Sequence, residues 1–171
     1  MFEPVNPLET LMQAAVTNPA KILDFYRALL ESELYILTPD TELEPGRRRS
    51  LKLHEKISVA TVEFKDKTWH PAFTAPKRIS AYLKEPETCL QAKARDLFVL
   101  LPRGSNFWLN PQSECQKPLP GDEIALLLSG KIFTMAARPR RVDSSTALSQ
   151  ELDSALGISA PRLMAGAVAG R

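Results

Sequence analysis

The chain has 171 residues, of which 44% are hydrophobic and 25% are charged, and its formal net charge at pH 7 is +2. This composition is typical of one globular domain with a real core, and the length leaves no room for a second full domain. A charge balance this close to neutral excludes a whole-chain field that would draw the protein to nucleic acid or to an acidic membrane.

The two cysteines, Cys89 and Cys115, lie far apart and belong to no motif with metal-ligand spacing. They fit a reducing compartment better than a disulfide scaffold. The N-terminus has no basic stretch followed by a continuous apolar run, and no apolar run approaches the ~20 residues of a membrane span. We therefore expect a cytoplasmic protein of bacterial type, with export by a signal-independent route left open.

Two helices are expected at the start of the chain. Asn6-Pro7 and Asn18-Pro19 each place a capping side chain before a proline that suits the first helical position. Apolar residues recur with helical spacing after both starts. They are Leu8, Leu11, Met12, Ala15 and Val16 in the first helix, and Ile22, Leu23, Phe25, Tyr26, Leu29 and Leu30 in the second. So short a connection predicts a helical hairpin or a bent pair.

Short apolar runs predict the strands. The first is the apolar run 34–37, which Thr38-Pro39 ends, and the clearest is the β-branched run 57–64. Lys65-Asp66-Lys67 predicts a hairpin turn into a return strand at 69–73, where Pro71 indicates an edge position or a very short pairing. Further strands are expected at 88–92, 107–109 and 131–135.

Three more helices are expected, near residues 76–83, 94–101 and 120–129. Strands and helices together predict an α+β fold, close to α/β: a small mixed β-sheet of about four to five strands covered by helices, with an N-terminal helical pair. We assign residues 1–135 to this domain. Residues 136–171 are expected to form a polar linker, one short helix and a loosely held tail.

Several stretches carry a likeness to a known family. They are Asn6-Pro7-Leu8-Glu9, Leu34 to Thr38-Pro39, Phe73-Thr74, Ala94-Arg95-Asp96-Leu97-Phe98, Leu109-Asn110-Pro111, Leu119-Pro120, Glu123-Ile124-Ala125-Leu126-Leu127 and Gly130. Their order and spacing over residues 6–130 resemble the SseB N-terminal domain, a bacterial family also called type III secretion SseB-like or enhanced serine sensitivity protein.

The resemblance implies a small α/β module without a known enzymatic activity or cofactor, so it supplies no catalytic residues. It links the chain loosely to serine sensitivity, to secretion loci and, through genomic neighbours, to toxin systems. Longer members continue into a second conserved domain. Only a short stretch follows Gly130 here, so we expect a single stand-alone module.

Two tryptophans and one turn are the best candidates for a binding surface. Phe107 and Trp108 are neighbours in a predicted strand, so their side chains point to opposite faces. If helices cover only one face, an exposed aromatic marks a binding surface on the other, and Trp69 is a second candidate anchor. Asn110-Pro111 is either a structural turn, with the Asn side chain bonding backbone amides, or the rim of a partner-binding groove.

The other candidate sites have simpler interpretations beside them. Arg47, Arg48 and Arg49 form either a solvated loop, a phosphate contact, or a basic patch that speeds encounter with an acidic partner. A Cys-His pair, Cys115 with His70 or Cys89 with His54, has the residue types of a nucleophile and its base, but no flanking motif supports either pair. No spacing indicates a metal site or a cofactor.

These observations predict a non-enzymatic protein-binding module that acts as an adaptor, chaperone or immunity protein for a secreted effector or toxin. The expected contact residues are Trp69, Trp108, Asn110, Arg47, Arg48 and Arg49. No membrane contact is expected, and nucleic acid is disfavoured. One alternative is an enzyme with a scattered site of His70, Glu63 and Cys115. Another is a weak nucleic-acid binder that uses the 47–49 loop.

Overall fold

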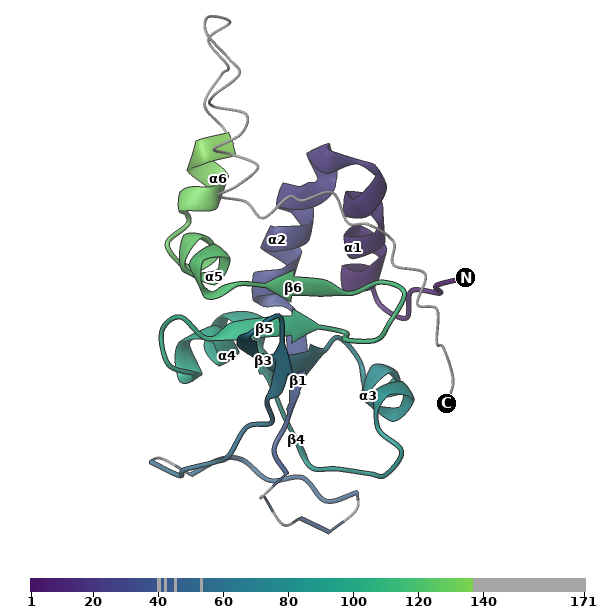
Figure 1. The fold of residues 1–171 in the computed structure, drawn as a ribbon, viewed down its shortest axis with the longest axis vertical. Coiled ribbons are helices and arrows are strands. Elements are labelled where there is room, and N and C mark those ends of the chain that lie inside the picture. Colours follow the sequence, from purple (N-terminus) through teal and green to yellow (C-terminus); the bar gives the residue numbers. More distant parts are fainter. Residues whose placement is uncertain (40, 42, 45, 53, 137–171) are drawn as a thin grey trace, which may run out of the picture.

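A computed structural model describes residues 1–136, except residues 40, 42, 45 and 53 (Figure 1). The helices are α1 (Pro7–Thr17), the 3-10 turn η1 (Pro19–Lys21), α2 (Ile22–Glu31), α3 (Pro76–Tyr82), α4 (Ala94–Leu100), α5 (Gly121–Leu128) and α6 (Lys131–Ala136). The strands are β1 (Glu33–Leu37), β2 (Val62–Phe64), β3 (Lys67–Phe73), β4 (Cys89–Lys93), β5 (Asn106–Leu109) and β6 (Lys117–Leu119). The fold is α+β with an N-terminal helical pair, as the sequence predicts.

The strands form one mixed sheet in the order β4-β1-β3-β5-β6, and β2 also pairs with β3. The pairing of β3 with β5 is parallel, whereas all other pairings are antiparallel. One edge of β3 is shared: β2 pairs with its first half and β1 with its last residues. β3 is therefore the central strand of the sheet.

Of the two alternatives predicted for Pro71, the edge position is wrong, because Pro71 lies in the central strand β3, whereas the pairing of β1 with β3 beside it is indeed very short, with two register pairs. The carbonyl of Ala72 accepts from the amide of Asn110 on the β5 side, so the backbone groups of Pro71 face the opposite side. There, β2 pairs only as far as Trp69 and β1 begins its pairing at Ala72. The missing N–H of Pro71 thus falls in the gap between two partner strands and costs the sheet no hydrogen bond.

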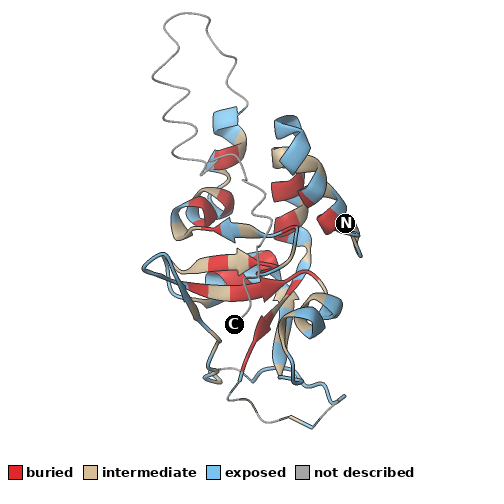
Figure 2. Cartoon of the chain, turned by 45° about the vertical axis from the view of Figure 1, so that its right-hand side comes forward, coloured by how far each residue is buried: buried red, intermediate tan, exposed pale blue. Residues whose placement is uncertain are grey.

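Four helices, joined by Ile132 of α6, pack on one face of the sheet and build the core. α1, α2, α4 and α5 contribute Leu8, Met12, Phe25, Leu29, Leu97, Phe98, Ile124 and Leu127, and the strands contribute Leu34, Ile36, Ala72, Phe107, Leu109 and Leu119. Figure 2 shows the buried residues concentrated in the strands and on the inward sides of these helices. α3 lies away from α1 and α2, and its Tyr82 ring is 5.2 Å from that of Phe73 on the other face. That face is covered only in part.

Local sequence signals account for the first helix and the hairpin. The side chain of Asn6 accepts a hydrogen bond from the amide of Glu9, and Pro7 occupies the first turn of α1. Lys65 and Asp66 have φ of 51° and 58°, which is the left-handed pair that a two-residue hairpin turn requires. The predicted turn is therefore confirmed without a glycine.

Three local predictions differ from the structure. Residues 131–135 were expected as a strand but form helix α6, because Gly130, with φ of 73°, ends α5 and the next turn inserts Ile132 into the core. The apolar pair Ile132-Phe133 is too short for its spacing to distinguish a helix from a strand. Of the run 57–64 only β2 is a strand, and β6 is a strand that the sequence did not predict. The predicted tail, residues 136–171, lies outside the described residues apart from Ala136.

None of the described helices has the length and apolar character that crossing a bilayer requires.

Candidate functional site

The two neighbouring aromatic residues of β5 point to opposite faces of the sheet, as their spacing predicts. Phe107 is buried beneath the helices, where its ring lies 4.9 Å from that of Phe98. Trp108 is only half-buried and projects from the other face. Among the described residues no helix covers β5 on this face, so an aromatic side chain remains within reach of solvent.

Trp108 belongs to a cluster of three rings that we call the aromatic patch: Phe64, Trp69 and Trp108. The ring of Trp108 lies 4.6 Å from that of Phe64 and 6.2 Å from that of Trp69. Two hydrogen bonds fix the indoles, because Trp69 Nε1 donates to the carbonyl of Phe64 at 3.1 Å and Trp108 Nε1 donates to Gln116 Oε1 at 3.0 Å. The patch is therefore a rigid, preformed surface.

The three rings differ in what a partner can touch. Trp69 is 7% exposed, so it supports the patch from below and is not itself an anchor. Phe64 is 41% exposed and Trp108 is half-buried, and these two offer the contact area. Sequence reasoning missed Phe64, although its alternation with Val62 along the strand was a sufficient signal.

Two lysines flank the patch. Lys65 Nζ lies 5.3 Å from the ring centroid of Phe64, and Lys67 pairs with Phe64 across the hairpin. Within the part of the chain that the structure describes, neither lysine forms an ion pair. Asp66 at the tip and Glu63 on β2 make the hairpin neutral as a whole, so the positive charge beside the patch comes from the side chains of Lys65 and Lys67, next to Phe64. The rim of the patch therefore favours a partner with carboxylates.

A second feature is a buried polar network around the carboxylate of Glu9, which is fully buried in α1. Arg78 of α3 binds it with two bonds, from Nε to Oε1 at 2.8 Å and from Nη2 to Oε2 at 2.7 Å. Thr74 Oγ1 also donates to Oε1, and the amide of Val5 donates to Oε2 at 2.9 Å. The fourth partner is Asn110, whose Nδ2 lies 3.3 Å from Oε1.

The network fixes the charge state of Glu9. Burial alone raises the pKa of a carboxyl group, but the hydrogen bonds from Arg78, Thr74 and the Val5 amide outweigh it and lower the pKa of Glu9 from 4.5 to about 2. The bond with Glu9 in turn raises the pKa of Arg78. Both groups are thus charged at neutral pH, and their donors and acceptors are satisfied by one another.

Asn110 joins this network to the turn after β5. Its Oδ1 accepts from the amide of Thr74 at 3.0 Å, and its backbone has φ of 48°, a conformation that asparagine tolerates better than most residues. These contacts agree with the structural interpretation of Asn110-Pro111. The side chain is fully buried, so it can influence a partner only through the position that it gives the turn.

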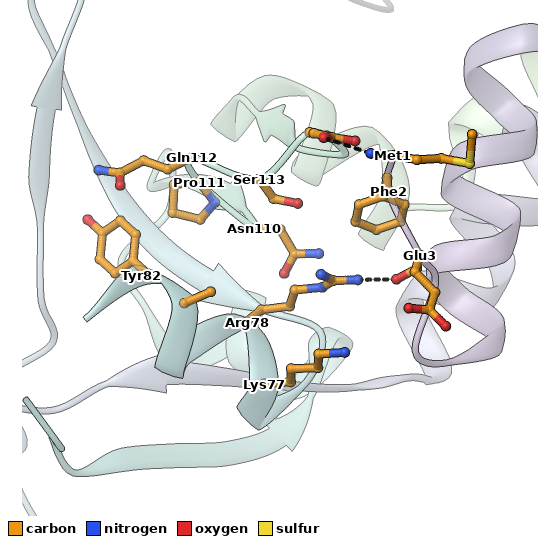
Figure 3. Close-up of a pocket in the computed structure, with 12 residues that line it drawn as sticks. Met1, Phe2, Glu3, Lys77, Arg78, Tyr82, Asn110, Pro111, Gln112 and Ser113 are labelled. Carbon is orange, nitrogen blue, oxygen red and sulfur yellow. Dashed lines mark hydrogen bonds and ion pairs between the residues drawn. The ribbon is translucent and has the colours of Figure 1, made fainter. Parts of the chain in front are cut away.

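A hollow of about 340 Å³ lies beside this network (Figure 3). α3, the 110–114 turn and the N-terminal residues line it, and the close-up shows Arg78 donating to the carbonyl of Glu3, at 2.6 Å. The guanidinium of Arg78 also lies 4.4 Å from the ring centroid of Phe2. Arg78 therefore ties the N-terminal segment to α3 through its Nε and Nη2 atoms.

The arginine run is less basic than its sequence indicates. Arg49 forms a two-point ion pair with Glu55, at 2.5 and 2.8 Å, and Arg47 lies 3.3 Å from Glu44. Only Arg48 lacks a carboxylate partner among the described residues. The loop thus neutralises most of its own charge, which weakens both the phosphate-contact and the acidic-partner interpretations of this run.

The residues of the enzyme alternative do not converge. His70 Nδ1 lies 3.2 Å from the carbonyl of Ala60, and burial lowers the pKa of this histidine. Glu63 bonds Thr68, and the thiol of Cys115 is buried with a pKa raised to about 11. No hydrogen bond joins any two of these candidates in the described structure. Nor do the described residues include a cluster of three or more His, Cys, Asp or Glu side chains that could hold a metal ion.

Comparison with known proteins gives one match. The family model described as SseB protein N-terminal domain matches residues 8–126, which span α1 to α5 and contain both the aromatic patch and the buried network. No curated protein and no solved structure matches the chain.

Proposed function

Because the chain belongs to the SseB protein N-terminal domain family, we propose that it is a non-enzymatic module that binds a partner protein through the aromatic patch. The partner we infer is a secreted effector or toxin, for which this chain serves as an adaptor, chaperone or immunity protein in the cytoplasm. The observation that carries the proposal is the pair of neighbouring aromatic side chains, Phe64 and Trp108, that remain partly exposed in the described part of the chain.

The energetics of interfaces support this choice of surface. Binding energy concentrates in a few aromatic side chains that are held rigidly and lose their water on contact. Trp108 meets the first requirement, since its indole is tethered to Gln116 and supported by Trp69. A rigid anchor loses little conformational entropy on binding, so most of the area that it buries contributes to affinity.

The rim of the patch indicates the chemistry of the partner. Lys65 and Lys67 stand beside the rings without carboxylate partners among the described residues. A complementary surface would place an apolar side chain against Phe64 and Trp108, with Asp or Glu next to it. Opposite charges at such a rim speed association and make it sensitive to salt.

The test is co-purification from the native host with the product of the neighbouring gene, followed by titration calorimetry of the isolated pair. Trp108→Ala and Phe64→Ala should each weaken binding at least about tenfold, whereas Lys67→Ala should mainly slow association at low salt. Val99→Ala is the matched control, because Val99 on α4 is 69% exposed and lies outside the patch. Wild-type affinity in both patch variants, with unchanged circular dichroism, would remove the patch from the interface.

A further inference from the structure

The two edges of the sheet are protected unequally. β6, at one edge, is three residues long and contains Pro118, which has no N–H to offer an incoming strand. β4, at the other edge, runs for five residues with neither a proline nor a bulge. An edge strand of this kind is a template for another strand.

The register shows which backbone groups of β4 face outward. Thr38 donates to the carbonyl of Thr88 and Ala94 donates to the carbonyl of Ser32, so the even-numbered residues of β4 bond β1. The N–H groups of Cys89, Gln91 and Lys93, and the carbonyls of Cys89 and Gln91, therefore point away from the sheet. No hydrogen bond from the described residues reaches any of these groups, and all three side chains are exposed.

We propose that β4 pairs antiparallel with β4 of a second copy of this chain, about a two-fold axis at Gln91, so that two sheets join into one. In this register Gln91 exchanges both backbone bonds with its counterpart. The N–H of Lys93 donates to the carbonyl of Cys89 of the second copy, and the reverse bond follows by symmetry. A closed two-fold contact uses the same surface on both copies, as this one does.

The side chains favour this pairing over other registers. On one face Lys93 stands opposite Cys89 and Gln91 opposite Gln91, so no two residues of like charge are directly opposed across the strand pair. On the other face the half-buried Leu90 and Ala92 stand opposite one another and extend the apolar layer. Moving the axis to Lys93 would oppose two lysines and shorten the overlap, and moving it to Cys89 would shorten the overlap as well. The central register is thus the most complementary one.

A cysteine at position 93 tests the register directly. In the proposed dimer, residues 93 and 89 of different copies form a hydrogen-bonded pair with Cα atoms about 5.5 Å apart, within the range of a disulfide. The two native Cys89 residues would be offset by four residues, about 13 Å along the strands, which is too far. The same spacing along one strand prevents Cys89 from bonding position 93 of its own chain. Cys115 is buried and takes no part.

We expect Lys93→Cys to form a covalent dimer under mild oxidation within minutes, and wild type and Lys67→Cys, a matched exposed lysine on β3, to link far more slowly. Light scattering of the reduced wild-type chain should give twice the mass of one chain at high concentration. Gln91→Pro, which removes an outward N–H that the monomer does not use, should shift the equilibrium from dimer to monomer.

A wild-type chain that stays monomeric at millimolar concentration overturns the proposal, and so does a Lys93→Cys variant that links no faster than Lys67→Cys. The second result would assign any observed dimer to another surface.

Discussion

Replacing Arg78 with methionine tests how the Glu9 network holds the helices to the sheet. The change keeps most of the aliphatic stem but removes the cation and both bonds to a carboxylate that is fully buried. Breaking a buried pair by removing one partner typically costs about 3–5 kcal/mol. The Val5 amide and two side-chain donors still bind Glu9, so we place the loss of unfolding free energy at about 3 kcal/mol. The pKa of Glu9 leads to a similar figure, because holding it at about 2 instead of 4.5 is worth up to about 3 kcal/mol at neutral pH.

This loss should depend on pH in a defined direction. The pKa of Glu9 is lower in the folded protein than in the unfolded chain, so its stabilisation is complete above pH ~5 and fades as the pH falls toward 2. In the variant, burial acts on Glu9 without the cation, so the pKa rises and the carboxylate takes up a proton sooner. The difference in stability between wild type and variant should therefore shrink by roughly a third to a half between pH 7 and pH 4.

Urea unfolding at pH 7 and pH 4, followed by circular dichroism, measures both effects. Lys77→Met is the matched control, since Lys77 precedes Arg78 on α3 and is exposed, and it should change stability by less than about 0.5 kcal/mol at either pH. A loss below about 1 kcal/mol for Arg78→Met, or a loss that is the same at both pH values, would refute this account of the network.

Three further substitutions test the turns and the close backbone contact that frame the fold. Asn110→Ala removes the acceptor of the Thr74 amide and leaves alanine with φ of 48°, so unfolding free energy should fall by about 2–3 kcal/mol; a fall under about 1 kcal/mol would contradict the role given to the side chain. Gly121→Ala would place a Cβ 2.5 Å from the carbonyl oxygen of Gly104. It should lower the unfolding free energy by about 3 kcal/mol or more, because the atoms that the Cβ meets belong to the backbone and cannot rotate away. Gly130→Ala, which meets nothing within 4 Å but has φ of 73°, should cost only about 1 kcal/mol, and equal losses at the two glycines would exclude the close approach as the cause.

The parts of the fold that follow from local chemistry were predictable. The caps at Asn6 and the hairpin at Lys65-Asp66 depend on residues close in sequence, and both are present. The opposite orientation of Phe107 and Trp108 follows from strand geometry alone. The edge position predicted from Pro71 was wrong because the cost of a proline in a strand depends on which neighbouring strand lies beside it. Here that depends on where β2 ends and β1 begins, which is a property of the assembled sheet.

The buried network was out of reach for the same reason. Glu9 and Arg78 are separated by 69 residues, and only the fold brings them together. One signal was available: Glu9 lies one residue from Leu8 and three from Met12, both buried in α1, so a carboxylate was due to face the interior and to need a partner. Its partner could not be identified from the sequence, because many exposed arginines are equally compatible with that requirement.

Fluorescence of Trp108 tests the central claim most directly, because the chain has two tryptophans and both lie in the aromatic patch. In a Trp69→Phe variant the emission of this chain comes from Trp108 alone. If the partner contains tryptophan, its own emission is measured in complex with a variant of this chain that lacks both indoles, and this spectrum is subtracted. Binding of the partner should shift this emission to the blue and protect it from acrylamide. A partner that binds with wild-type affinity while the emission and the quenching of Trp108 stay unchanged would contradict docking at the patch.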